Sequence, residues 1–138
     1  MIIVPNTGVG TIMLGSTRPA VRALLGDEAE SFKRTESSEW PCDYFARIGI
    51  FVYYRAPGVV EAIELCRPAS AIVDSLDLLR VPILKAIEHL KGLDPDLEVA
   101  EDSFTSYKLG VGGYAPDMDD PNSEAESIIV FRPGYYDA

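Results

Sequence analysis

Carboxylates offer the most chemistry in this sequence, and they are concentrated in one segment. Residues 94–126 contain ten acidic residues and a single basic one, Lys108, whereas residues 1–92 contain 11 acidic and 10 basic residues. The ten acids are Asp94, Asp96, Glu98, Glu101, Asp102, Asp117, Asp119, Asp120, Glu124 and Glu126. Nearly all of the net charge of −10 comes from this segment. It predicts either two solvated loops or an acidic surface that docks a basic partner.

The run from Asp117 to Glu124 has the oxygen-rich composition that calcium prefers. An EF-hand loop beginning at Asp117 would need glycine at its sixth position and glutamate at its twelfth. The sequence has Asn122 and Ile128 at those places. We therefore expect a solvated hairpin loop here and assign no metal site.

Catalysis by a Ser–His–Asp or Cys–His arrangement would have to use His89, the single histidine. His89 lies in a predicted helix, and the sequence places no nucleophile beside it. The glycines of residues 8–10 and 110–113 match neither a phosphate loop nor a dinucleotide-binding fingerprint. The second group predicts a bulge or a close backbone approach within a strand. We assign no catalytic residue and no cofactor, which favours a non-enzyme without deciding the point.

The overall charge limits the kinds of partner. A protein with a pI of about 4.4 and no dense Lys/Arg run is repelled by nucleic acid and by anionic membranes. No stretch approaches the roughly 20 apolar residues of a membrane span, and Pro5 interrupts the apolar start too early for a signal peptide. We expect a cytoplasmic protein. Cys42 and Cys66 match no metal-binding spacing, and they are expected as two thiols, with a disulfide between them left open.

Aromatic residues are the other candidates for binding. Trp40 stands in a loop-like context, Ser-Glu-Trp-Pro-Cys-Asp, and seven tyrosines are present. Tyr and Trp are frequent anchors of protein interfaces, although most aromatic residues simply cover a core. The candidate partner-binding residues are Trp40, Tyr53, Tyr114, Asp117, Asp119 and Asp120.

Two helices and several strands must position these residues. Residues 16–26 predict a helix with Ser16 or Thr17 as its N-cap and Gly26 as its stop, and Val21, Leu24 and Leu25 are expected to share its buried face. Residues 82–91 predict a second helix. Strands are expected at 44–54, 59–66, 103–109 and 127–131, with weaker signals at 1–4 and 30–35.

The two halves of the chain echo one another. Residues 49–53 match residues 110–114 at an offset of 61, and residues 60–63 match residues 125–128 at an offset of 65. The fold class is therefore predicted as α+β: an antiparallel sheet with helices packed on one face, built from two related helix-strand-strand-strand units. The chain is expected to form a single domain over residues 1–138, with half-repeats at about 11–66 and 76–132.

The pattern Leu14-Gly15-x-Thr17-x-x-x-Val21-x-x-Leu24-Leu25-Gly26, followed by a sheet, resembles the first repeat of β-lactamase inhibitor proteins. It is also similar to the small lipoproteins of the outer-membrane barrel-assembly machinery. The resemblance covers about a dozen residues and implies helices packed on antiparallel sheet and a role in binding other proteins. No binding residue of those families aligns with this sequence.

These patterns together predict a non-catalytic protein-binding module of the inhibitor or immunity-protein type. Its partner would be another protein, with basic toxins such as nucleases as complementary candidates for an acidic face. The alternative is a small enzyme or ligand-binding domain whose site lies on the open sheet face and includes carboxylates, tyrosines and His89. A structural subunit of a homo-oligomer also stays open.

Overall fold

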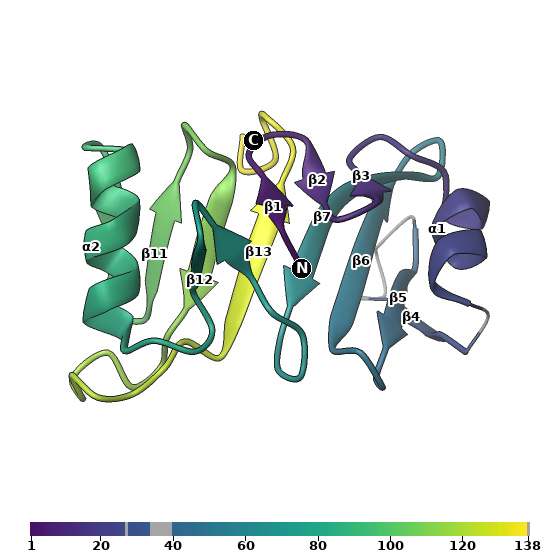
Figure 1. Cartoon of the computed structure of the whole chain (residues 1–138). Coiled ribbons are helices and arrows are strands. Elements are labelled where there is room, and N and C mark those ends of the chain that lie inside the picture. The colour runs from purple at the N-terminus through teal and green to yellow at the C-terminus, as the bar shows by residue number, and fades with distance from the viewer. Residues whose placement is uncertain (27, 34–39, 138) are drawn as a thin grey trace.

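The computed structural model describes residues 1–26, 28–33 and 40–137. Its main element is an eight-stranded antiparallel sheet in the order β10-β11-β12-β13-β7-β6-β5-β4. These strands are β4 (Glu30–Phe32), β5 (Cys42–Phe45), β6 (Ile50–Arg55), β7 (Val59–Leu65), β10 (Glu98–Val99), β11 (Ser103–Ser106), β12 (Val111–Tyr114) and β13 (Ser127–Phe131). Two helices stand at opposite ends of the sheet (Figure 1). The protein belongs to the α+β class, as the sequence predicts.

The first helix, α1 (Arg18–Leu25), begins and ends on the signals seen in the sequence. The Thr17 hydroxyl accepts a hydrogen bond from the backbone N–H of Ala20, at 3.3 Å. Gly26 ends the helix with a φ of 94°, which glycine adopts without a Cβ clash. Val21 is buried, but Leu24 is 54% exposed, so the expected three-residue buried face was wrong at Leu24. The reason is length: eight residues at the end of a sheet bury only a narrow stripe.

The second helix, α2 (Ile83–Leu93), follows its apolar periodicity closely. Its buried residues are Ile83, Ala86, Ile87 and Leu90, which lie on one face because they repeat at intervals of three and four. The helix continues through Gly92 to Leu93, two residues beyond Lys91, where the sequence predicts its end, and Asp94 is its C-cap.

Turns interrupt two of the expected strands. The stretch 44–54 divides into β5 and β6, because the backbone N–H of Gly49 closes a turn onto the carbonyl of Phe45 at 3.0 Å. Gly49 has a φ of 72°, which favours glycine. The stretch 103–109 likewise ends at Ser106, where Gly110 closes the turn onto Ser106 at 2.9 Å. In the weak 30–35 prediction, Glu30–Phe32 forms β4, and residues 34 and 35 lie outside the described residues.

Short strands complete the fold, and of these only β1, within the weak signal at 1–4, was expected from the sequence. β1 (Ile3–Val4), β2 (Gly8–Val9) and β3 (Ile12–Met13) form one small sheet, and β8 (Ile72–Val73) pairs with β9 (Leu76–Asp77). A bridge between Ile2 and Ile72 joins the two small sheets. Two-residue strands are too short to show alternation, so sequence periodicity cannot find them.

The halves of the large sheet are arranged in the same order from each end. Each half is a helix followed by four strands, and the last strands, β7 and β13, lie side by side at the centre. Ile50 pairs with Leu65 in one half, and Val111 pairs with Val130 in the other. These pairs are displaced by the same 61 and 65 residues that the sequence comparison found. The expected helix-strand-strand-strand unit omitted the first strand of each half, β4 and β10, because these strands are short. The half-repeat boundaries stay a prediction.

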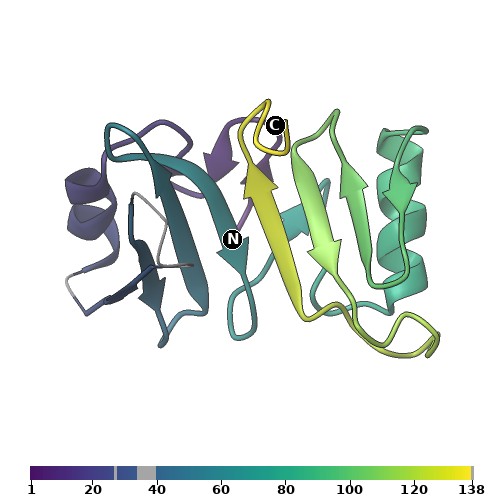
Figure 2. The same cartoon turned by 180° about the vertical axis from the view of Figure 1, so that it is seen from behind.

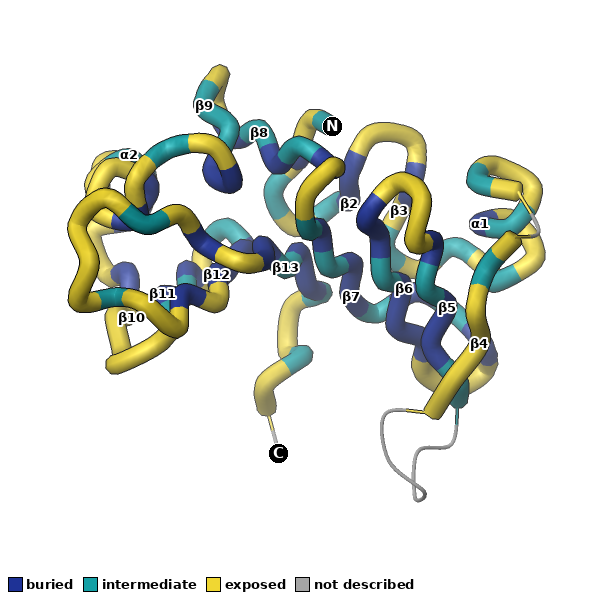
Figure 3. The backbone as a smooth tube through the Cα atoms, turned by 90° about the horizontal axis from the view of Figure 1, so that it is seen from below, coloured by how far each residue is buried: buried dark blue, intermediate teal, exposed yellow. Residues whose placement is uncertain are grey.

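The main core joins the helices to one side of the sheet. Val21 of α1 and Leu90 of α2 share one buried cluster with the alternate residues Ile50 and Val52 of β6. A smaller cluster of Cys42, Tyr53, Ala62 and Phe131 lies on the opposite side and contains no helix residue from the described part of the chain. We call this opposite side the outer face. Figure 3 shows the C-terminal segment leaving the sheet on this side.

Candidate functional site

Two acidic segments that are separate in the sequence meet at one edge of the sheet. This edge is formed by the ends of the strands β11, β12 and β13, at the register partners Ser103, Tyr114 and Ser127. The turn before β11 contains Glu101 and Asp102, and the loop between β12 and β13 (Figure 2) contains Asp117, Asp119, Asp120, Glu124 and Glu126. The backbone N–H of Ala115 donates to the carbonyl of Asp102 at 2.7 Å, so the two segments are in direct contact.

We call this cluster the acidic edge. Its members are exposed, and they are Glu101, Asp102, Asp117, Asp119, Asp120, Glu124 and Glu126. Three acids of the predicted segment do not belong to it. Asp94 is buried and accepts a 2.6 Å hydrogen bond from Ser106, while Asp96 and Glu98 follow α2 on the other side of the 100–102 turn. The sequence left open whether the acids of residues 94–126 form two solvated loops or one surface, and the structure brings these seven of the ten to one edge.

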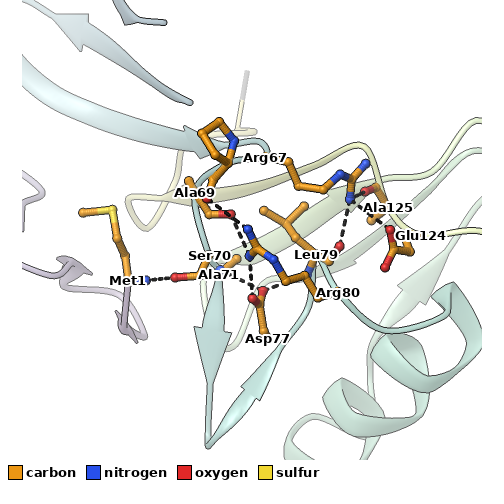
Figure 4. A network of polar contacts seen from close by, with 11 residues as sticks. Met1, Arg67, Ala69, Ser70, Ala71, Asp77, Leu79, Arg80, Glu124 and Ala125 are labelled. Atoms are coloured by element: carbon orange, nitrogen blue, oxygen red, sulfur yellow. Dashed lines mark hydrogen bonds and ion pairs between the residues drawn. The ribbon is translucent and has the colours of Figure 1, made fainter. Parts of the chain in front are cut away.

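The acidic loop is held near its C-terminal end by contacts with the rest of the fold. The backbone N–H of Ile83, at the start of α2, donates to the carbonyl of Ser123 at 2.8 Å. Arg67 donates to the carbonyls of Leu79 and Ala125 at 2.8 and 2.9 Å and lies 3.7 Å from Glu124 (Figure 4). These contacts fix the loop's position but neutralise little of its charge, because six of the seven carboxylates have no ion pair among the described residues.

The aromatic candidates have different surroundings. Tyr114 is 45% exposed and stands at the acidic edge itself. Tyr53 is only 7% exposed, so its ring is not available as an anchor; it packs in the outer-face cluster. Trp40 is half-buried against the main core, and its ring lies over Gly58, where a Cβ would be 3.1 Å from it. The structure thus brings Tyr114, Asp117, Asp119 and Asp120 together, and leaves Trp40 and Tyr53 apart from them.

The outer face contains a carboxylate that the sequence analysis did not select. Glu64 of β7 is half-buried and accepts hydrogen bonds from the Tyr53 hydroxyl at 2.5 Å and the Ser127 hydroxyl at 2.7 Å. It stands between Phe51 of β6 and Ile129 of β13 in register. The only sequence signal was that Glu64 is one of two charged residues, with Glu61, in a strand whose other residues are apolar.

The other buried carboxylate, Asp43, has a structural role. Its side chain has no exposed surface and accepts paired hydrogen bonds from Arg18 and from Arg22, and one from Tyr54. Burial alone would raise the pKa of the Asp43 carboxyl, but these hydrogen bonds outweigh it and lower the pKa to about 2. Burial, together with the Asp43 charge, raises the pKa of Tyr54. The cluster ties α1 to β5 and β6 on the helix side of the sheet.

His89 does not join the tyrosines of the outer face. It lies on α2 in an open depression lined by Asp74, Ser75, Leu76, Lys85 and Glu88, on the side of the small β8–β9 sheet. Its Nε2 atom is 2.7 Å from the carbonyl oxygen of Val73. No hydroxyl, thiol or carboxylate of the described residues forms a hydrogen bond with it. The predicted alternative site, which combined His89 with sheet-face tyrosines and carboxylates, is therefore not assembled.

The remaining chemistry-bearing groups are dispersed. Cys42 and Cys66, which are both described, are not joined by a disulfide, and burial raises the pKa of the Cys66 thiol. Within residues 1–26, 28–33 and 40–137, no group of three or more His, Cys, Asp and Glu side chains is arranged to hold a metal ion. The strand glycine Gly113 faces the side-chain ring of Phe104, where a Cβ would lie 2.2 Å from the ring; the neighbour is a side chain, and not the backbone expected from the sequence. Neither helix of the described residues has the length and apolar character to cross a membrane.

No family model matches the chain, and no curated protein or solved structure matches it either. The resemblance to β-lactamase inhibitor proteins and barrel-assembly lipoproteins accordingly stays a prediction.

Proposed function

We propose that the protein is a non-catalytic binding module that docks a basic protein against the acidic edge, in the manner of an inhibitor or immunity protein. One observation carries this proposal. Two acidic segments about 15 residues apart in the chain converge at the ends of β11, β12 and β13, with Tyr114 exposed among them.

The physical argument concerns both the rate and the orientation of docking. Seven exposed carboxylates on one edge create a local negative potential that attracts a positively charged protein over about a Debye length, roughly 8–10 Å at physiological salt. Such complementarity raises the association rate and fixes the register of the partners. Tyr114 supplies a rigid amphipathic ring at the same edge, a common anchor in interfaces. The cytoplasmic setting expected from the sequence is part of the proposal.

The test compares capture by three forms of the protein from a lysate of its host. The edge variant carries Asp117→Asn, Asp119→Asn and Asp120→Asn. The matched control carries Asp74→Asn, Glu88→Gln and Asp96→Asn, which remove the same charge away from the acidic edge. We expect one basic partner to bind the wild type and the control at low salt, and to be lost from the edge variant and at high salt.

The captured partner is then purified, and its association rate is measured by stopped flow across ionic strengths. The rate should fall steeply with salt for the wild type and less steeply for the edge variant. A rate that does not depend on salt, or equal losses in the edge variant and the control, would contradict docking at the acidic edge.

A further inference from the structure

The carboxylate of Glu64 occupies the centre of the outer face. β7 lies in the middle of the eight-stranded sheet, and Glu64 is in register with Phe51 on one neighbouring strand and Ile129 on the other. The next pairs in this row are Phe51 with Tyr44 and Ile129 with Gly112. A charged group is thus surrounded by apolar, aromatic and small side chains, where a lone carboxylate is costly to hold.

Two hydroxyl groups orient this carboxylate. Tyr53 donates to one oxygen and Ser127 to the other, at 2.5 and 2.7 Å. An ionised carboxylate has about four acceptor positions, so each oxygen of Glu64 keeps one for a further donor. The arginines in ion pairs within the described residues all pair with acids other than Glu64. Among the residues that the structure describes, the charge of Glu64 is therefore positioned by hydrogen bonds and has no ion-pair partner.

Aromatic rings stand in parallel beside it. Tyr44 and Phe51 are stacked with centroids 4.1 Å apart and an interplanar angle of 14°, and Phe51 and Tyr53 are inclined by 15° at 6.3 Å. Tyr44 and Phe51 are half-buried, so part of each ring faces solvent. A planar guanidinium group can stack on such rings while it donates to a carboxylate, whereas an ammonium group acts as a point charge.

The position of Glu64 is continuous with the acidic edge. Ser127, which donates to Glu64, is the register partner of Tyr114 at that edge. A protein docked on the acidic edge and on Tyr114 would extend over Ser127 to the centre of the outer face. A positively charged side chain of that protein would be attracted along the same path.

We propose that Glu64 receives one arginine side chain of the basic partner, with the guanidinium donating to the two remaining acceptor positions of the carboxylate and stacking beside Phe51 and Tyr44. This inference rests on the proposed function and names the side chain that the partner contributes. Interface hot spots are the residues whose truncation costs the most binding energy, and they are rich in arginine and tyrosine. An arginine that pairs with a carboxylate in this way is typical of such residues.

The test uses the full chain labelled with ¹⁵N and capped arginine, N-acetyl-arginine methylamide, as the probe. The neutral isostere N-acetyl-citrulline methylamide is the matched control ligand. We expect arginine to give saturable shifts of the amide resonances of Phe51, Glu64 and Ser127, and citrulline to give none at those positions. In Glu64→Gln, which keeps the side-chain shape, arginine binding should weaken at least about tenfold.

Two control variants separate this subsite from general charge effects. Glu61→Gln removes the same charge from the same strand, at a residue whose carboxylate lies 3.7 Å from Arg132, and it should leave arginine binding unchanged. Glu64→Asp keeps the charge but retracts it from Tyr53 and Ser127, and should weaken binding as Glu64→Gln does. A resonance pattern close to that of the wild type verifies that each variant is folded.

The outcomes also separate the subsite from the acidic edge. The edge variant should retain arginine binding at Glu64. If the wild type captures no basic partner but still gives the arginine shifts, that result counts against the proposed function alone. Absence of saturable shifts, or equal shifts in the wild type and Glu64→Gln, would overturn the arginine subsite alone. Shifts of the same resonances that depend on protein concentration without the probe would assign the outer face to a second copy of this chain and overturn the proposal.

Discussion

The hydroxyl of Ser127 donates a 2.7 Å hydrogen bond to the carboxylate of Glu64, across the junction of the two halves of the sheet. The two residues are 63 positions apart in the chain and lie on the adjacent central strands β13 and β7. This bond connects the acidic edge, where Ser127 pairs with Tyr114, to the centre of the outer face. It makes one continuous surface out of features that belong to different halves.

A double-mutant cycle measures this bond. We expect Glu64→Ala and Ser127→Ala each to lower the free energy of unfolding by about 1 kcal/mol or more, with a coupling energy of about 1–2 kcal/mol, because the bond joins a hydroxyl to a charged group. Urea denaturation of the four proteins gives the values. Ser103→Ala, at the same sheet edge on β11, serves as the uncoupled control. A coupling energy near zero would show that Ser127 does not hold the carboxylate.

The buried carboxylate of Asp43 should make the stability of the protein depend on pH in the acid range. Its folded-state pKa of about 2 lies below the ordinary value of 3.8. Above about pH 4 the carboxylate is charged in both states and the stabilisation is complete; it is lost as the pH falls from about 4 to 2, because the unfolded chain binds the proton first. This difference between the two pKa values corresponds to about 2 kcal/mol in the free energy of unfolding.

The test of Asp43 is a set of denaturation curves between neutral and acid pH. Asp43→Asn should lower the free energy of unfolding by about 3 kcal/mol at neutral pH, since it leaves Arg18 and Arg22 without their shared carboxylate. The variant should also lose less stability than the wild type between about pH 4 and pH 2. Parallel pH curves for the two proteins would contradict this assignment.

Two glycines should respond to alanine in opposite directions. A Cβ at Gly113 would lie 2.2 Å from the Phe104 ring, which is fully buried, so Gly113→Ala should destabilise the protein by roughly 3 kcal/mol. Gly92 lies within α2, and a Cβ there meets nothing within 4 Å. Gly92→Ala should therefore stabilise the protein by about 0.5–1 kcal/mol. Thermal melts of both variants test these opposite changes in stability. A small loss of stability in Gly113→Ala would mean that the Phe104 ring can move aside.

Mutual repulsion between the carboxylates of the acidic edge should destabilise the folded protein. In the edge variant, with Asn at positions 117, 119 and 120, we expect the free energy of unfolding to rise by roughly 0.5 kcal/mol at low ionic strength. The difference should disappear at high salt, which screens exposed charges. The matched control with the Asp74, Glu88 and Asp96 replacements should gain less, because those residues lie apart from the acidic edge. Equal gains in both variants would mean that only the total charge matters.

The elements that depend on near neighbours could be predicted from the sequence. Thr17, Pro19 and Gly26 mark the ends of α1 through hydrogen bonds and φ angles within a few residues. The apolar spacing in residues 83–90 predicts α2, and the composition of residues 94–126 predicts an acidic region. The 61- and 65-residue offsets between the halves also reappear in the pairing of Ile50 with Leu65 and of Val111 with Val130.

Only the tertiary structure decided which of these features come together. The meeting of Glu101 and Asp102 with the 117–126 loop, the burial of Asp43 beneath two arginines and the contact between Ser127 and Glu64 all depend on strand register. Register between distant strands is set by the packing of whole faces, and a shift by one residue would turn every side chain to the opposite side. Local propensities act over a few residues and carry no information about partners 60 residues away. The sequence therefore determined the helices and the charge of this protein, while the packing of its sheet determined its binding surface.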